Sequence, residues 1–356
     1  MHRGLKSYFT LLAQSLVFWI IVFFSFTFFR HFGIQQELSF FVDEPLDIPV
    51  ELFYGPIIIL AISFGVCFSL IEFIFQKFIS KRLSIIINVA FKAIIYLALL
   101  ILILTPITYM IEIYIDRDLP NDKGWWKESQ LFYTILVYTA LGSIIFSTLT
   151  ILKEKFGRQN FLNMLVGKYR KPQEEEKIFM FLDLKSSTTI AEKIGHIKYS
   201  SFIQDCFKDL NSIIKNYDAE IYQYVGDEAV LTWDYNKGIE HNNCVNFFFK
   251  FNRILNQKEK YYIKKYGFTP TFKAGLHGGK VIITEVGTIK KEIAYHGDVI
   301  NTAARIQSQC NVHDKLLLIS EKLLKNLDLR HYKNKFMGNI ALRGKEEKVE
   351  LYAVEL

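Results

Sequence analysis

The chain has 356 residues, of which 51% are hydrophobic, and Phe alone accounts for 32 of them. This apolar content is high for a purely soluble protein and is concentrated in the first half, so the two halves are different kinds of chain. The net charge of +7 does not by itself indicate a nucleic-acid-binding protein, because much of the basic charge flanks the apolar segments. The four cysteines are widely spaced without a CxxC pair, which indicates neither a disulfide framework nor a thiolate metal site.

The first half contains four apolar segments that predict membrane-spanning helices. Each segment is about as long as the ~20 residues that a helix needs to cross the hydrocarbon layer. Lys and Arg gather before the first segment, between the second and third, and after the fourth, whereas the connection between the first and second is acidic. The positive-inside rule therefore predicts an even number of crossings with both termini in the cytoplasm. The segments are residues 8–29, 52–75, 85–107 and 131–152.

Two ionisable residues fall inside these segments, Glu72 in the second and Lys92 in the third. Each side chain could extend to the membrane surface. Unpaired charges in a membrane interior are costly, however, so the sharper hypothesis is that Glu72 and Lys92 pair across two helices.

A linker is expected over residues 153–175, between a membrane domain at 1–152 and a soluble domain at 176–356. Apolar residues recur at helical spacing in this basic segment, and Pro172 is expected to end the helix. Such a helix could lie on anionic lipid, or it could pair with the same helix of a second chain.

The second half predicts an α+β domain, a mixed sheet with helices packed on it. The near-continuous apolar strand at 178–184 includes Asp183, and a tight hairpin is expected at 221–233 around Gly226 and Asp227. Gly-Asp-Glu is also ordinary turn chemistry. Together, however, two strand-end carboxylates could share metal ions that bridge a nucleoside triphosphate.

Further polar residues near the C-terminus could act on phosphate. Asn301 and Arg305 are four residues apart, so they share one face of an expected helix. An amide and a guanidinium there could orient a reacting group and oppose charge on a phosphoryl oxygen. Arg343 follows an expected strand and offers a second cation. Taken singly, each of these residues is also compatible with an ordinary solvent-exposed role.

Four motifs in this order resemble the catalytic domain of the class III nucleotidyl cyclases, the adenylate and guanylate cyclases: FLDLKSST, YVGDEAVL, AYHGDVINTAAR and LRGKEEKVELY. The resemblance covers roughly residues 176–356. It implies a ferredoxin-like catalytic domain, here preceded by a four-helix transmembrane bundle, as in a membrane-bound bacterial cyclase.

The resemblance also implies roles for individual residues. It implies two divalent cations, Mg²⁺ or Mn²⁺, bound by Asp183, Leu184 and Asp227. It implies that Asn301 and Arg305 stabilise the transition state. Residues implied to bind substrate are Arg343 on the triphosphate, the phosphate cradle of Ser186, Ser187 and Thr188, and Gln223 and Ala294 at the base.

The implied reaction converts a nucleoside triphosphate into a 3′,5′-cyclic nucleotide and pyrophosphate. Family members combine metal ligands and transition-state residues from opposite protomers, so a homodimer is implied, which favours the paired-helix interpretation of the linker. The implied location is the inner (plasma) membrane, with the lipid bilayer as a partner, a cytoplasmic catalytic domain and no nucleic-acid partner.

The base is left open by two departures from the family pattern. Gln223 stands where adenylate cyclases have Lys and guanylate cyclases Glu, and Ala294 stands where the family usually has Asp, Thr or Cys. Gln both donates and accepts, and Ala does neither. ATP is the first choice on family prevalence, with GTP or a pyrimidine nucleotide open. The alternatives are a catalytically silent membrane receptor or scaffold, and a diguanylate cyclase, in whose expected turn Val225 and Ala229 do not fit.

Overall fold

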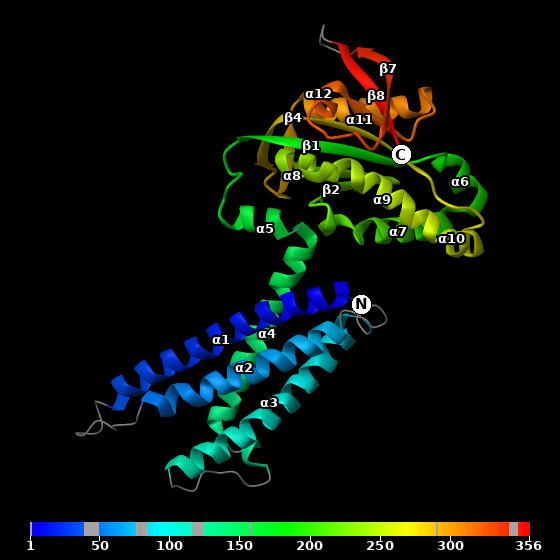
Figure 1. Cartoon of the computed structure of the whole chain (residues 1–356). Coiled ribbons are helices and arrows are strands. Elements are labelled where there is room, and N and C mark those ends of the chain that lie inside the picture. The colour runs from blue at the N-terminus through cyan, green and yellow to red at the C-terminus, as the bar shows by residue number, and fades with distance from the viewer. Residues whose placement is uncertain are drawn as a thin grey trace. The chain divides into compact units, whose positions relative to one another are not determined.

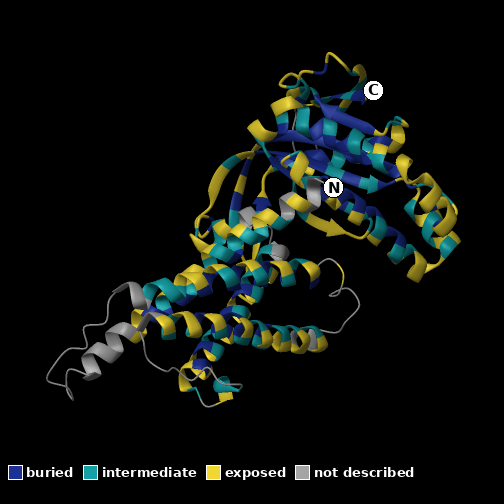
Figure 2. Ribbon diagram, turned by 60° about the horizontal axis from the view of Figure 1, so that its bottom comes forward, coloured by how far each residue is buried: buried dark blue, intermediate teal, exposed yellow. Residues whose placement is uncertain are grey.

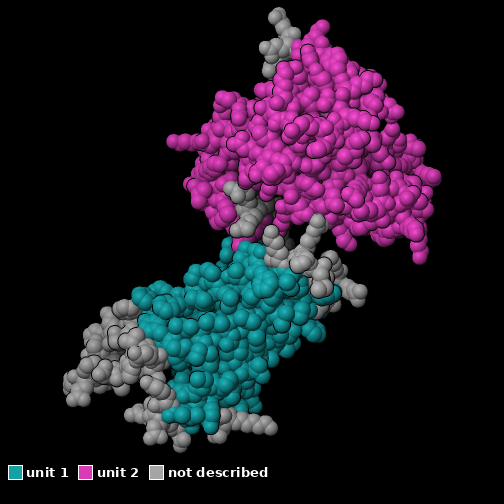
Figure 3. Space-filling view, viewed as in Figure 1, with its two compact units in different colours: residues 1–152 teal, residues 153–356 magenta. Residues whose placement is uncertain are grey.

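The computed structural model describes residues 2–38, 50–75, 78, 85–115, 124–127, 129–156, 158–289, 291–341 and 348–356. The chain forms two compact units, Met1–Leu152 and Lys153–Leu356 (Figure 3). Each unit has its own hydrophobic core, so each is described separately.

The first unit consists of long helices (Figure 1). Four of the described helices are long and apolar enough to cross a membrane, over residues 8–30, 54–74, 90–113 and 130–153. This agrees with the four spans predicted from the sequence. A short 3-10 helix, η2 (Trp125–Lys127), precedes the last of them. The four helices are α1 (His2–Leu38), α2 (Val50–Ile74), α3 (Ile85–Ile115) and α4 (Gln130–Phe156).

The core of the first unit is aromatic and closely packed. Trp19 of α1 is fully buried, with its ring 4.6 Å from Phe64 and 5.1 Å from Phe68 of α2. Gly142 of α4 allows close approach, because a Cβ there would come within 3.0 Å of the Trp19 ring. Many residues on these helices are exposed (Figure 2). They include large apolar side chains such as Leu102. An apolar exterior around a packed core is the surface expected of a bundle in lipid.

Glu72 and Lys92 form an ion pair between α2 and α3, which confirms the pairing hypothesis. The Lys92 Nζ atom lies 2.7 Å from both carboxylate oxygens of Glu72, and the Tyr96 hydroxyl donates to Glu72 Oε1 at 2.9 Å. Glu72 is only 4% exposed, and Lys92 also lies over the Phe75 ring. The pair therefore satisfies both charges within the bundle instead of at its surface.

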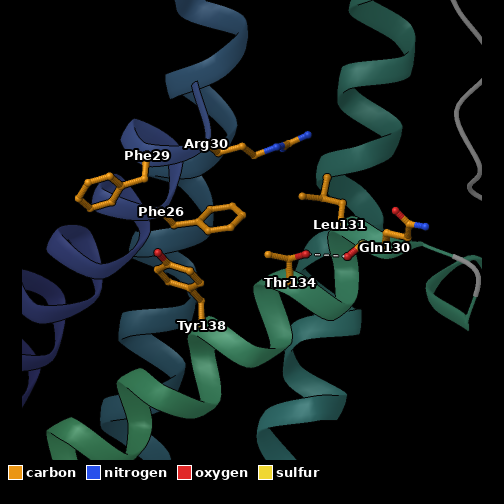
Figure 4. A pocket seen from close by; sticks show the side chains of 7 residues that line it. All are labelled: Phe26, Phe29, Arg30, Gln130, Leu131, Thr134 and Tyr138. Carbon is orange, nitrogen blue, oxygen red and sulfur yellow. Dashed lines mark hydrogen bonds between the residues drawn. The ribbon is translucent and has the colours of Figure 1, made fainter. Parts of the chain in front are cut away.

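A hollow of about 500 Å³ opens between the end of α1 and the start of α4 (Figure 4). Its lining includes the rings of Phe26, Phe29 and Tyr138 and the Arg30 side chain. The Phe26 and Tyr138 rings meet edge to face at 4.9 Å. The hollow thus combines aromatic walls with one cationic group.

The linker is folded onto the second unit. Its helix α5 (Arg158–Leu165) ends well before Pro172, so the expectation that the helix runs to Pro172 is wrong. Gly167 has a φ of 67° just beyond this end, a conformation that glycine adopts without strain. Tyr169 is then buried on the sheet, and its main-chain oxygen accepts a hydrogen bond from Glu285 N. A chain reversal and an apolar contact, not a proline, end the helix.

The second unit is built on an eight-stranded sheet with the order β2-β3-β1-β4-β6-β8-β7, and β5 pairs with β4. All pairings are antiparallel except β4 with β6, so the sheet is mixed, as predicted. The strands are β1 (Gln173–Leu184), β2 (Glu220–Val225), β3 (Glu228–Asp234), β4 (Phe272–Val286), β5 (Glu292–His296), β6 (Leu317–Ser320), β7 (Lys333–Ala341) and β8 (Lys348–Glu355). The helices are α6 (Ser187–Ile194), α7 (His196–Asn211), η3 (Ile214–Asn216), α8 (Tyr235–Ile239), η4 (Glu240–Asn242), α9 (Asn243–Gln257), α10 (Glu259–Tyr266), α11 (Asp298–Val312) and α12 (Glu321–Leu324).

Helices cover both faces of this sheet (Figure 1). The alternation of β1 shows why, since Met180 and Leu182 enter the core with α7 and α9 whereas Phe179 enters the core with α11. The helix α11 lies very close to β4, because a Cβ on Gly275 would meet the Gln307 nitrogen at 2.2 Å. The apolar run of β1 is buried on both faces, as predicted. The strand ends at Leu184, and α6 begins shortly after it at Ser187.

Candidate active site

Asp183 lies near the end of the central strand β1, where two buried side chains hold its carboxylate. Lys273 of β4, its cross-strand neighbour, brings Nζ to 3.1 Å from Asp183 Oδ2. Gln307 of α11 donates to the same oxygen at 2.9 Å. Burial and the charge of Asp227 raise the pKa of the Asp183 carboxyl, and the Lys273 ammonium opposes that shift. A carboxylate in this position is a fixed negative charge with one cation already beside it.

Asp227 lies in the turn of the β2–β3 hairpin, as predicted. Val225 pairs with Glu228 across the turn, and Gly226 adopts a φ of 62°, as a two-residue hairpin turn requires of its first central residue. The Oδ2 atom of Asp227 is buried and has no hydrogen-bond partner among the described residues. Burial together with the charges of Asp183 and Asp227 raises the pKa of Glu228 to about 7. The sheet therefore brings three carboxyl groups from two connected strands into one electrostatic cluster.

The start of α6 follows β1 directly and presents main-chain N–H groups. Ser186 precedes the helix in a left-handed conformation with φ of 60°, and its side chain does not cap the helix. Ser187 is half-buried, and Thr188 is exposed. Helix N-termini attract anions because their first N–H groups lack intrahelical partners. This arrangement is compatible with the phosphate cradle predicted for residues 186–188.

Asn301 and Arg305 share one face of α11, as their spacing predicts, and that face points away from the sheet. Asn301 is exposed and Arg305 is half-exposed, whereas Ala303 and Gln307 of the same helix are buried against the strands. Neither the Asn301 nor the Arg305 side chain makes a hydrogen bond or ion pair with Asp183 or Asp227 in the described structure. Within one chain, the predicted metal ligands therefore make no hydrogen bond or ion pair with the predicted transition-state residues in the described structure.

The predicted base readers lie on two strands whose aromatic residues touch. Gln223 is exposed on β2 beside a β-bulge, and Ala294 is half-buried on β5. The rings of their neighbours Tyr222 and Tyr295 lie 4.8 Å apart. Arg343, the predicted triphosphate ligand, lies outside the residues that the structure describes.

Sequence reasoning did not identify three residues at this site. Lys273 of β4 and Gln307 of α11 both contact Asp183, although they are far from it in the sequence, and neither belongs to one of the four motifs. Tyr199 is the third, since burial and the charge of Asp227 raise its pKa to about 12 and it also contacts Ser187. Lys273 alone carried a signal, because it interrupts the short apolar segment 272–276, where a buried lysine needs a partner.

Residues 170–355 match the family model described as the adenylate and guanylate cyclase catalytic domain, which covers more than half of the chain. The chain belongs to this family. Its cyclase domain is therefore that of a class III nucleotidyl cyclase, as the four motifs predicted, and the preceding four apolar helices fit a membrane region.

The curated relatives of this domain include both an adenylate cyclase and a guanylate cyclase. Adenylate cyclase 2 of Rhizobium meliloti (strain 1021) is 36% identical over 195 residues, which cover 54% of this chain and 53% of that protein. The receptor-type guanylate cyclase gcy-10 of Caenorhabditis elegans is 24% identical over 179 residues, covering 49% of this chain and 16% of that protein. The chain thus spans about half, or less, of the length of these relatives.

Solved structures support the fold. The structure of a bacterial light-regulated adenylyl cyclase aligns with a TM-score of 0.54 at 20% identity, covering 64% of this chain and 66% of that one. At this identity the likeness establishes the fold and nothing finer.

The residues present fit divalent cations. Mg²⁺ and Mn²⁺ prefer carboxylate and carbonyl oxygens, and the orphaned Oδ2 of Asp227 is such a donor. Leu184 has a buried apolar side chain, so only its main-chain carbonyl could contribute. No group of three or more His, Cys, Asp or Glu side chains forms a self-contained metal cage within the described residues. Mg²⁺ commonly binds through one or two carboxylates plus substrate phosphates, which suits this arrangement.

Proposed function

We propose that this protein is a membrane-bound nucleotidyl cyclase that makes a 3′,5′-cyclic nucleotide and pyrophosphate for intracellular signalling. The observation that carries the proposal is the placement of Asp183 and Asp227 beside the start of α6 in a domain of this family. ATP is the first candidate substrate, because the Rhizobium relative at 36% identity is named an adenylate cyclase.

In this proposal Asp183, Asp227 and the Leu184 carbonyl hold two divalent cations. Such cations would lower the pKa of the ribose 3′-hydroxyl and neutralise triphosphate charge. The N–H groups of residues 186–188 at the start of α6 would bind phosphate oxygens. The 3′ oxygen then bonds to the α-phosphorus, its proton leaves to solvent, and the bond to pyrophosphate breaks.

Asn301 and Arg305 are proposed to act on the substrate bound by a second copy of the chain. Their face of α11 points away from their own sheet, whereas Gln307 of that helix reaches their own Asp183. In a homodimer, the amide would orient the reacting ribose and the guanidinium would oppose charge growing at the α-phosphoryl group. Arg343 would bind the triphosphate.

The four apolar helices are proposed to anchor the protein in the inner (plasma) membrane. In this proposal both termini and the catalytic domain are cytoplasmic, which the distribution of Lys and Arg around the four apolar helices supports. This location gives the enzyme access to cytoplasmic nucleoside triphosphates.

The test is to incubate the full-length protein in detergent with Mn²⁺ and each of ATP, GTP, CTP and UTP, and to identify the products by mass spectrometry. One cyclic product that disappears in the Asp183→Ala variant supports the proposal and identifies the base. Nucleotide binding without any product would instead support the silent receptor.

A further inference from the structure

The strand that carries Ala294 has a polar neighbour that the family pattern does not mark. Ala294 of β5 pairs directly with Thr284 of β4 in antiparallel register. Residues paired in this way share one face of the sheet, with Cβ atoms about 4.5–5.5 Å apart. The Thr284 hydroxyl therefore lies beside the position where the family has its second base-reading side chain.

The opposite face of the same strand pair is committed to the core. Ile283 and Tyr295, the next pair along, are buried with Phe179 in the cluster under α11. Tyr222 joins that cluster through its ring contact with Tyr295. Because side chains alternate along a strand, Ala294 and Thr284 point to the other face, away from these aromatic rings.

The Thr284 hydroxyl is available to a ligand. The residue is half-buried, and its side chain makes no hydrogen bond with any described residue. A half-buried hydroxyl without a protein partner is stabilised when a ligand or water completes its hydrogen bond. His296 lies on the same face two residues beyond Ala294, opposite Ile282, but it is exposed.

We propose that Thr284 is the specificity-determining residue that reads the base in place of Ala294. This inference rests on the proposed cyclase function. A hydroxyl both donates and accepts, so the Thr284 side chain can pair with a polar edge of a base that reaches Ala294. Discrimination arises because a base that leaves this hydroxyl unpaired binds less tightly.

The experiment separates base binding from catalysis. Full-length protein in detergent is titrated with 3′-deoxy-ATP and 3′-deoxy-GTP, which lack the attacking hydroxyl and cannot cyclise, in the presence of Mn²⁺. Thr284→Val removes the hydroxyl at nearly constant shape, and Thr284→Ser retains it. The matched control is Thr288→Val, which changes an exposed Thr in the connection between β4 and β5.

Thr284→Val should change the ratio of the two dissociation constants by roughly three- to tenfold, the range for one hydrogen bond. Thr284→Ser should keep the wild-type ratio, and so should Thr288→Val. An unchanged ratio in Thr284→Val would overturn the inference, as would a shift produced by His296→Ala instead. The dissociation constants of both analogues are measured without any turnover, so they test the role of Thr284 separately from catalysis. A protein that binds the analogues but makes no cyclic product would refute the proposed activity, and the ratio of dissociation constants would still decide the role of Thr284.

Discussion

At the residue scale, the site gathers negative charge that the protein alone does not neutralise. Glu228 has a pKa of about 7 because of burial and its proximity to Asp183 and Asp227. A carboxyl with a folded-state pKa above its unfolded value of about 4.3 destabilises the fold at every pH where the unfolded chain ionises it. The carboxyl cluster is thus a local cost that bound cations can offset.

Glu228→Gln should therefore stabilise the protein at pH 8 in EDTA, because the amide removes one of three crowded charges. The gain should shrink as the pH falls through about 7 and vanish below about 4.3, where the wild-type carboxyl is protonated in both states. Thermal unfolding of the two proteins across this pH range measures it.

Saturating Mn²⁺ should also reduce the gain, since the cation neutralises the cluster in the wild type. A constant difference in melting temperature at all pH values would show that Glu228 is not titrating near 7.

At the element scale, α11 is held against β4 at a position that tolerates no side chain. A Cβ on Gly275 would lie 2.2 Å from the Gln307 nitrogen and 2.8 Å from the Ala303 carbonyl oxygen. Both obstructing atoms are main-chain atoms, so the helix itself would have to move. This contact sets the position from which Gln307 reaches Asp183.

Gly275→Ala should lower the free energy of unfolding by about 1–3 kcal/mol or more, as overpacking does, and should weaken Mn²⁺ binding by displacing Gln307. Chemical denaturation and calorimetric titration of Mn²⁺ test the two effects. Ser308→Ala, on the exposed side of α11, is the control. Normal stability in Gly275→Ala would mean that the helix and strand are farther apart than described.

The pairing of α2 with α3 through Glu72 and Lys92 gives a second prediction at this scale. Either neutral substitution, Glu72→Gln or Lys92→Met, leaves the other charge unpaired inside the bundle, which is the costly state. The double variant should be more stable than the sum of the single losses predicts, by about 0.5–3 kcal/mol for residues in contact. Thermal unfolding of the full-length variants in detergent measures the coupling, and strictly additive losses would argue against the pair.

At the scale of the whole molecule, the orientation of α11 makes a prediction about assembly. If each site takes metal ligands from one chain and Asn301 and Arg305 from another, then Asp227→Ala and Arg305→Ala damage different halves of a site. Each variant alone should be inactive. A mixed dimer of the two retains one site built entirely from wild-type residues.

Equal co-expression of the two variants should restore about a quarter of the wild-type activity, because half of the dimers are mixed and each has one intact site of two. Product formation by the co-purified mixture measures this recovery. Co-expression of Asp183→Ala with Asp227→Ala is the control and should restore none, because both changes affect the same half. Absence of recovery in the first mixture would place the whole site within one chain.

The amino-acid sequence by itself determined the four spans, the α+β class, the hairpin around Asp227 and the shared face of Asn301 and Arg305. These features are encoded in hydrophobic period, turn chemistry and residue spacing, which are local properties. Even the pairing of Glu72 with Lys92 followed from the cost of isolated charge in a span.

Only the tertiary structure decided which distant groups meet. Lys273 and Gln307 reach Asp183 because β4 lies beside β1 and α11 lies over both, and Thr284 stands beside Ala294 because of strand register. The linker helix ends early for the same kind of reason, since burial of Tyr169 on the sheet outweighs local helical spacing. Such contacts join residues far apart in the chain, and their energies depend on packing and register that no local pattern contains.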